Sequence, residues 1–340
     1  MNSRDLIPDT SPEASRISTA LAECRLLDAR QLTYEWLSRW ESSLDCNVTR
    51  NELRQPFLWS CIADVTERTG DHFIIEHFWQ VLERLPPPAL GSDQLPLLGI
   101  PILNRIDLLH RLIDSLDHPV QTLAIVDNSA NASPSEAKEI SEQLQALQQL
   151  GHPLIDKIEI AKPFRNLGVA ASWNLILTSF PEATAALLAN NDVRFAPGVL
   201  ASAVRQINTS RPQFFPLLPE PNGFSAFILT AACWDRIGLF DPSFHPAYCE
   251  DLDYRDRIRA TPEVDWLPGG TIHDAMAPLN QEHSATIASD PWLAEQNRAS
   301  FALNRLWYFS QRRVRGDCRG AWRRLWLSQW RRAPDPQPTP

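Results

Sequence analysis

An acidic group near residue 250 is the stretch of the sequence best suited to chemistry. Glu250, Asp251 and Asp253 fall within one helical turn, directly after an aromatic, proline-bearing segment at 238–249. Like charges at this spacing repel one another. Such a cluster is typical of a site that uses a cation, or a carboxylate whose pKa is raised. The alternative is a solvated helix start, since the helix dipole favours acidic residues in the first turn.

The elements expected to position this group begin at residue 95, where apolar runs of strand length alternate with helical patterns. Strands are predicted over 97–103, 121–126, 154–160 and 185–189, with helices over 107–116, 133–150 and 169–179. This alternation predicts an α/β fold with a mostly parallel sheet flanked by helices.

The expected carboxyl ends of the strands are polar. They carry Asn104-Arg105, Asp127-Asn128, Arg165-Asn166 and Asn190-Asn191-Asp192. Ligands of open α/β sheets bind beyond the carboxyl ends of the strands. The sequence therefore predicts a binding site at this edge of the sheet.

Two common nucleotide-binding motifs are missing from the sequence. No G-x-G-x-x-G follows the first expected strand, and no G-x-x-x-x-G-K-[ST] occurs in the chain. Classical dinucleotide and P-loop binding are therefore disfavoured. A phosphate would be held by a metal ion, by arginine or by a helix N-terminus.

Charge is distributed unevenly along the chain. The net charge is −9, but residues 311–340 carry +6, which leaves −15 on the preceding 310 residues. This balance argues against a general nucleic-acid binder. The six cysteines are scattered without a C-x-x-C pair, and residues 1–5 lack a secretory pattern. Reduced thiols and a cytoplasmic location are expected.

Three regions are expected. Residues 1–90 form a helical region in which a helix starts at Ser11-Pro12-Glu13, residues 91–310 form the α/β domain, and 311–340 form a basic, tryptophan-rich helix and a proline-rich tail. Trp322, Trp326 and Trp330 are spaced by four, among arginines. This pattern indicates an amphipathic helix that lies on an anionic membrane, at its inner face, or packs on the protein or a partner subunit. We favour packing slightly.

Residues 96–285 resemble the family 2 glycosyltransferases of the GT-A fold, and most closely their rhamnosyltransferase-like branch, which acts on bacterial surface polysaccharides. The segments that carry the resemblance occur in the family's order. They are 100–105 (IPILNR), 126–129 (VDNS), 165–174 (RNLGVAASWN), 187–195 (LLANNDVRF) and 223–259.

The resemblance implies a GT-A-type sheet and a role for each matching residue. The nucleotide-sugar site would be formed by Pro101, Asn104, Arg105, Asp127, Asn128, Arg165, Asn166, Gly168, Asn174, Asn190 and Asn191. Asp192 and His273 would bind Mg²⁺ or Mn²⁺, which neutralises the leaving diphosphate. Asp251 would be the general base and Glu250 would orient the acceptor. A single displacement would invert the anomeric centre.

Several assignments have alternatives. Asn190 stands where the family's D-x-D motif has a carboxylate, and Asp253 competes with Asp251 as the base. Asp127 is alternatively a turn-forming residue. Arg165 is alternatively part of a surface ion pair, and His273 a loop histidine. Trp173 is expected in the core.

The resulting functional hypothesis is a metal-dependent inverting glycosyltransferase. It would move a sugar from a UDP-, dTDP- or GDP-linked donor to a hydroxyl of a glycan or lipid-linked acceptor, in polysaccharide biosynthesis. The alternative is a catalytically silent GT-A-like module that binds carbohydrate or scaffolds partners. A nucleotidyltransferase fits less well, because the glycine-rich, lysine-bearing phosphate loop of that class is missing.

Overall fold

A computed structural model of the protein describes residues 12–42, 56–84, 94–220, 222–268, 291–313, 319–322 and 325. The chain divides into two compact units, Met1–Pro87 and Pro88–Pro340, each considered by itself. His273, Trp326 and Trp330 lie outside the described residues.

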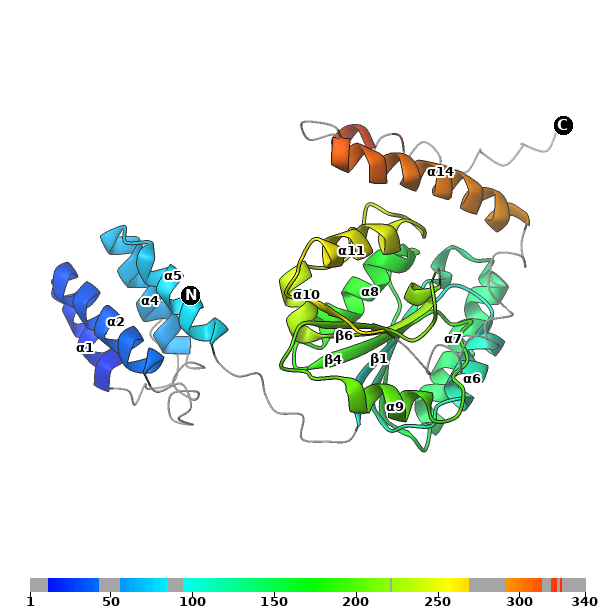
Figure 1. Cartoon of the computed structure of the whole chain (residues 1–340), viewed down its shortest axis with the longest axis horizontal. Coiled ribbons are helices and arrows are strands. Elements are labelled where there is room, and N and C mark those ends of the chain that lie inside the picture. Colours follow the sequence, from blue (N-terminus) through cyan, green and yellow to red (C-terminus); the bar gives the residue numbers. More distant parts are fainter. Residues whose placement is uncertain are drawn as a thin grey trace. The chain divides into compact units, whose positions relative to one another are not determined.

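The first unit is helical, as the sequence predicts. Its helices are α1 (Pro12–Ala22), α2 (Leu26–Glu41), α4 (Pro56–Thr69) and α5 (Phe73–Glu83) (Figure 1). Pro12 begins α1, a position where its missing N–H leaves no helical bond unmade. The apolar faces of the four helices share one core, in which the Trp36 and Trp40 rings lie 4.6 Å apart.

The second unit is built on a seven-stranded sheet of order β3-β2-β1-β4-β6-β5-β7. The strands are β1 (Leu95–Ile102), β2 (Val120–Asp127), β3 (Ile155–Ala161), β4 (Ala185–Ala189), β5 (Gln213–Pro216), β6 (Ala226–Thr230) and β7 (Asp265–Trp266). Among the pairings of these seven strands, those of β6 with β4 and β5 are antiparallel and the other four are parallel. The expected fold class, a mostly parallel sheet flanked by helices, is confirmed.

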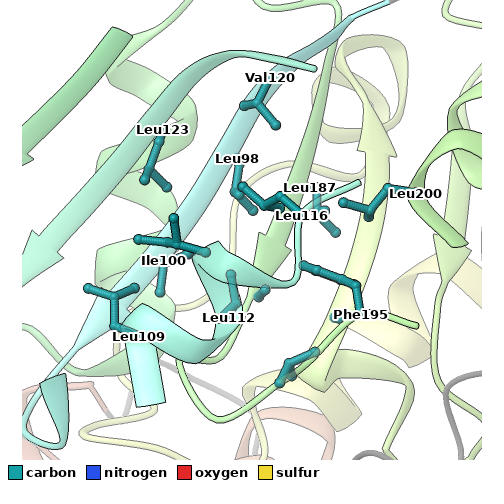
Figure 2. Packing of buried hydrophobic residues seen from close by; sticks show 14 of the residues in the cluster. Leu98, Ile100, Leu109, Leu112, Leu116, Val120, Leu123, Leu187, Phe195 and Leu200 are labelled. Atoms are coloured by element: carbon teal, nitrogen blue, oxygen red, sulfur yellow. The ribbon is translucent and has the colours of Figure 1, made fainter. Parts of the chain in front are cut away.

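Helices cover both faces of this sheet. One face carries α6 (Ile106–Asp114), α7 (Pro134–Leu150) and α9 (Val199–Gln206). Figure 2 shows part of this core, where Ile100 of β1 lies near Leu109 and Leu112 of α6, and Leu98 lies near Leu116 and Leu187. The other face carries α8 (Gly168–Ser179), α10 (Ala231–Ile237) and α11 (Glu250–Arg259).

Alternation along the strands explains the two cores. Leu98 and Ile100 face the first core, whereas Leu97 faces the second. Gly99 also faces α8, and a Cβ there would lie 2.7 Å from side-chain carbons of Ile176 and Leu188. The glycine therefore allows α8 to approach the sheet closely.

A long helix, α14 (Pro291–Arg313), lies beside α11 (Figure 1), and Tyr308 Oη donates a 2.6 Å hydrogen bond to Asp256 of α11. The expected boundary at residue 311 falls inside α14. Trp322 is buried and stacks on Trp307, with ring centroids 5.3 Å apart. This part of the tail therefore packs on its own domain. In the described part of the chain, no helix combines the length and apolarity needed to cross a membrane.

Candidate active site

The carboxyl ends of β4 and β1 are tied together by an asparagine side chain. Asn191 follows β4 and is buried, and its Nδ2 donates to the backbone oxygens of Asn104 (3.2 Å) and Arg105 (3.4 Å). Arg105 adopts left-handed backbone angles at the N-terminus of α6 and binds Asp107 through two 2.9 Å bonds. Its guanidinium holds the pKa of the Asp107 carboxyl below the ordinary range. The predicted residues Asn104, Arg105 and Asn191 thus meet at one point.

A second asparagine joins β2 to the start of α8. Asn128 is buried, and its Nδ2 donates to Ser172 Oγ while its Oδ1 accepts from the Leu167 N–H, both at 2.9 Å. Its own N–H donates to the Ile102 carbonyl at the end of β1, at 2.7 Å. Asn128 therefore fixes the edge of the sheet through bonds within the protein. Its contact with a nucleotide stays a prediction.

Asp127 ends β2 and is almost fully buried. One carboxylate oxygen accepts from the Ser129 N–H (2.9 Å), and the other lies 3.2 Å from Lys162 Nζ and accepts from Ser141 Oγ at 3.3 Å. The first contact is the turn-forming role considered as an alternative from the sequence. Lys162, which sequence reasoning did not single out, places a cation beside this strand end.

The start of α8 lies directly against the loop that leads into α11. Gly168 has φ of +76°, and a Cβ there would lie 2.5 Å from the carbonyl oxygen of Pro246. The Val169 N–H donates to that same oxygen at 2.6 Å. Asn166 caps the turn by accepting from the Gly168 N–H at 2.8 Å, while Arg165 is exposed. Glycine is therefore needed at 168 because its backbone has a positive φ and the Pro246 backbone leaves no room for a Cβ.

Asn174 makes a two-bond clamp on the same loop region. Its Nδ2 donates to the Phe240 carbonyl (2.8 Å), and its Oδ1 accepts from the Phe240 N–H (2.9 Å). Trp173, beside it, packs in the core between Phe227 and Phe240, as the sequence predicts. Together with Gly168, Asn174 attaches α8 to both ends of the segment 240–246. Its contact with a nucleotide stays a prediction.

The acidic group begins helix α11 and divides into three different environments. Glu250 is buried, and burial, helped by the charge of Asp251, raises the pKa of its carboxyl well above the ordinary value. Asp253 is also buried and pairs with Arg257, whose Nε lies 2.9 Å from its Oδ2. Asp251 is half-exposed. An accessible carboxylate is needed for proton abstraction, so the geometry favours Asp251 over Asp253 as a base.

Three further predicted residues surround the strand ends. Pro101 lies within β1, half-buried and in register with Val126. Asn190 follows β4, and its N–H donates to the Ser225 carbonyl at 2.8 Å. Asp192 follows Asn191 and is half-exposed. Among the described residues, no group of three or more His, Cys, Asp or Glu side chains gathers that could hold a metal ion. Asp192 alone is thus an incomplete metal site, and the predicted His273 lies outside the described residues.

His245 is a site residue that sequence reasoning did not single out. Its Nε2 lies 3.1 Å from the Asn166 carbonyl, so this nitrogen carries the proton. Burial lowers the pKa of His245 to about 4, an effect that the nearby Arg165 charge reinforces. The signal available in the sequence was its place in the segment between Gly238 and Glu250.

This histidine makes folding stability depend on pH. The unfolded chain binds a proton at 245 below about pH 6.5, while the folded chain does so only near pH 4. The contribution of His245 to the free energy of unfolding is therefore fully present above pH 6.5 and is lost as the pH falls toward 4. His245→Gln, which keeps a donor for the Asn166 carbonyl, should flatten this dependence. Urea unfolding of both proteins between pH 4 and 7.5 tests this, and parallel pH curves would contradict it.

No protein-family model and no curated protein sequence matches the chain. Solved structures with a similar backbone include GalNAc-T7 with UDP, GalNAc and Mn²⁺ (TM-score 0.41, 11% identity, 53% of this chain and 43% of that chain). TarS from S. aureus gives 0.37, with 14% identity over 50% of this chain and 34% of that chain. The inositol-1-phosphate CTP transferase from T. maritima gives 0.33, with 11% identity over 56% of this chain and 98% of that chain. The chain thus spans less than half of the first two proteins. These likenesses are distant.

Proposed function

We propose that this protein is an inverting glycosyltransferase that moves a sugar from a nucleoside-diphosphate donor to a hydroxyl of a glycan or lipid-linked acceptor. The observation that carries the proposal is the environment of the acidic group at the start of α11. Asp251 is half-exposed next to a buried Glu250, while Asp253 is occupied by Arg257. One accessible carboxylate beside a buried one matches the needs of general-base catalysis.

The donor would bind at the carboxyl edge of the sheet. The ends of β1, β2 and β4 are joined there by Asn128 and Asn191, and the start of α8 by Asn128. Asp127 and Asp192 stand at two of these ends, with Lys162 beside the first. Side chains fixed by such bonds hold a ligand without reorganising when it binds. The family 2 resemblance, with its rhamnosyltransferase-like branch, adds the nucleotide-sugar class to this proposal.

The reaction is a single displacement. Asp251 accepts the proton of the acceptor hydroxyl as its oxygen bonds to the anomeric carbon. The bond from that carbon to the diphosphate breaks, and the nucleoside diphosphate leaves with the electron pair. Attack opposite to the leaving group inverts the anomeric configuration, as in single-displacement glycosidases. Glu250, whose carboxyl has its pKa raised by burial, would help to orient the acceptor.

Asp192 would hold a divalent cation, Mg²⁺ or Mn²⁺, which when bound would supply positive charge to stabilise the leaving diphosphate. The described residues supply one carboxylate for it, at the end of β4. His273 is the second predicted ligand and lies outside the described residues.

Calorimetric titration of UDP, dTDP and GDP tests the donor class and the metal together. We expect one nucleotide to bind in the presence of Mn²⁺, and the binding to weaken about tenfold or more in Asp192→Ala, as is usual when a charged ligand group is lost. Asp156→Ala, an exposed carboxylate of β3, is the matched control and should bind as the wild type does. If no nucleotide binds with the metal present, the transferase proposal fails. A silent carbohydrate-binding or scaffolding module would then be the better interpretation.

A further inference from the structure

Helix α14 places two buried polar side chains against the backbone of the loop before α11. Ser300 and Asn304, one helical turn apart, are 1% and 0% exposed. Ser300 Oγ lies within donating distance of the His245 carbonyl (3.1 Å) and the Ala247 carbonyl (3.2 Å). Asn304 Nδ2 donates to the carbonyls of Ala247 (2.8 Å) and Tyr248 (3.1 Å). Carbonyls 245, 247 and 248 are thus held by this pair.

The loop they hold has an unfavourable backbone conformation. Tyr248 has φ of +82° and Cys249 φ of +71°, in the left-handed region that non-glycine residues rarely adopt. Such conformations are energetically costly for non-glycine residues and persist only where the surroundings hold them. Cys249 is also the N-cap of α11. The backbone at 248 and 249 therefore sets the direction in which Glu250 and Asp251 enter the helix.

Contacts on either side of this pair reinforce the attachment. Trp307 Nε1 donates to Asp241 Oδ2 at 3.0 Å, and Tyr308 Oη reaches Asp256. Phe244 and Cys249 share an apolar cluster with Trp307 and Trp322. The hydrogen bonds of Ser300 and Asn304 differ from these contacts because they reach backbone carbonyls of residues 245–248, directly before the acidic group. A buried polar side chain that only fills space can be replaced by an apolar one at little cost in stability. Removal of a side chain that donates to the backbone instead leaves buried carbonyl oxygens without a partner.

We propose that Ser300 and Asn304 are positioning residues, which act through the backbone of 245–248 to hold Asp251 and Glu250 in the geometry needed for proton abstraction. This inference rests on the proposed transferase function. In the proposed reaction, neither of these two side chains touches a reacting atom. They fix the loop from which the acidic group starts.

The first test reads the loop without using activity. Cys249 is buried in the loop, so its maleimide labelling, followed by peptide mapping, reports loop opening. The variants are Ser300→Ala and Asn304→Ala. Loss of one such hydrogen bond should raise Cys249 labelling about threefold to tenfold under native conditions. Ser310→Ala is the matched control, since among the described residues its hydroxyl donates to the Leu306 carbonyl of the same helix, at 2.7 Å. This variant should label as the wild type does.

The second test separates positioning from general stability. At saturating donor and acceptor, kcat of both variants should fall about tenfold or more, as expected for a displaced catalytic group. The dissociation constant of the nucleotide should stay within about threefold of wild type, since the strand-end contacts remain. Ser300→Thr, which keeps the hydroxyl, should restore kcat.

Raised labelling with lowered kcat and unchanged nucleotide affinity supports the proposal. Unchanged labelling in both variants, or an opened loop with unchanged kcat, overturns it. If Asn304→Ala does not fold, the milder Ser300→Ala still decides. If the wild type neither transfers sugar nor binds a nucleotide, the proposed function is refuted. The labelling of Cys249 would still show whether α14 holds the loop.

Discussion

Asp251→Asn is expected to lower kcat for glycosyl transfer by about 10²–10⁴-fold, the range typical of a lost general base. The reason is that Asp251 is the half-exposed carboxylate of the acidic group, whereas Glu250 and Asp253 are buried. The amide has nearly the same shape but accepts no proton at neutral pH. Initial rates at saturating donor measure the effect, and calorimetry should show nucleotide affinity close to that of wild type.

Asp253→Asn is the matched control for this variant. Asp253 binds Arg257 Nε at 2.9 Å, and Arg257 Nη1 in turn donates to the Ile237 carbonyl at 2.9 Å. Removing its charge should therefore lower the free energy of unfolding, because a partly buried guanidinium loses its partner. Activity per folded molecule should change much less than in Asp251→Asn. Equal losses of kcat in the two variants, or full activity of Asp251→Asn, would remove Asp251 from the proposed mechanism.

Gly168→Ala is expected to destabilise the second unit by about 3 kcal/mol or more, from positive φ and steric overlap together. The new Cβ would lie 2.5 Å from the Pro246 carbonyl oxygen and 2.8 Å from its Cα. Neither is the end of a flexible side chain, so α8 and the loop before α11 must separate. Urea unfolding of the variant measures the loss, and kcat should fall because the loop leads into helix α11, which carries Asp251.

Gly198→Ala separates the cost of positive φ from the cost of steric overlap. Gly198 has φ of +83°, but a Cβ there would meet nothing within 4 Å. The substitution should therefore cost about 1–2 kcal/mol, the penalty of the left-handed conformation alone. If both variants lose the same stability, contact with Pro246 does not make Gly168 necessary.

The central part of the fold was predictable from local patterns. The four strands expected from apolar runs are β1 to β4, and residues 185–189 match β4 to the residue. Strands β1, β2 and β4 are mostly buried, whereas β3 buries Ile155 and Ile158 and exposes residues between them. The apolar runs have strand length, and a predicted helix follows each of the first three strands, so period and length agree. Strands β5 to β7 and helices α9 and α10 were not foreseen. They are short, and β5 and β6 are buried at every position, so no alternation marks them.

The site was predictable in its location and less so in its roles. Polar side chains do gather at the strand ends, as the sequence predicts. Asn128, Asn174 and Asn191, however, hydrogen-bond to residues that lie 39–87 positions away in the sequence. Spacing along the sequence carries no information on such partners. The difference between Asp251 and Asp253 likewise depends on burial and on Arg257. Ser300 and Asn304 lie about 50 residues beyond the acidic group and match no motif.

Hydrogen–deuterium exchange with and without the nucleotide found by calorimetry, in Mn²⁺, tests the central claim most directly. The claim is that a nucleoside diphosphate binds at the carboxyl edge of the sheet. We expect slower exchange in 102–107, 127–131, 165–170 and 190–194, which hold the strand ends and the start of α8, and no change in the helices of the first unit. Protection confined to other segments, or none at all on binding, would contradict the account.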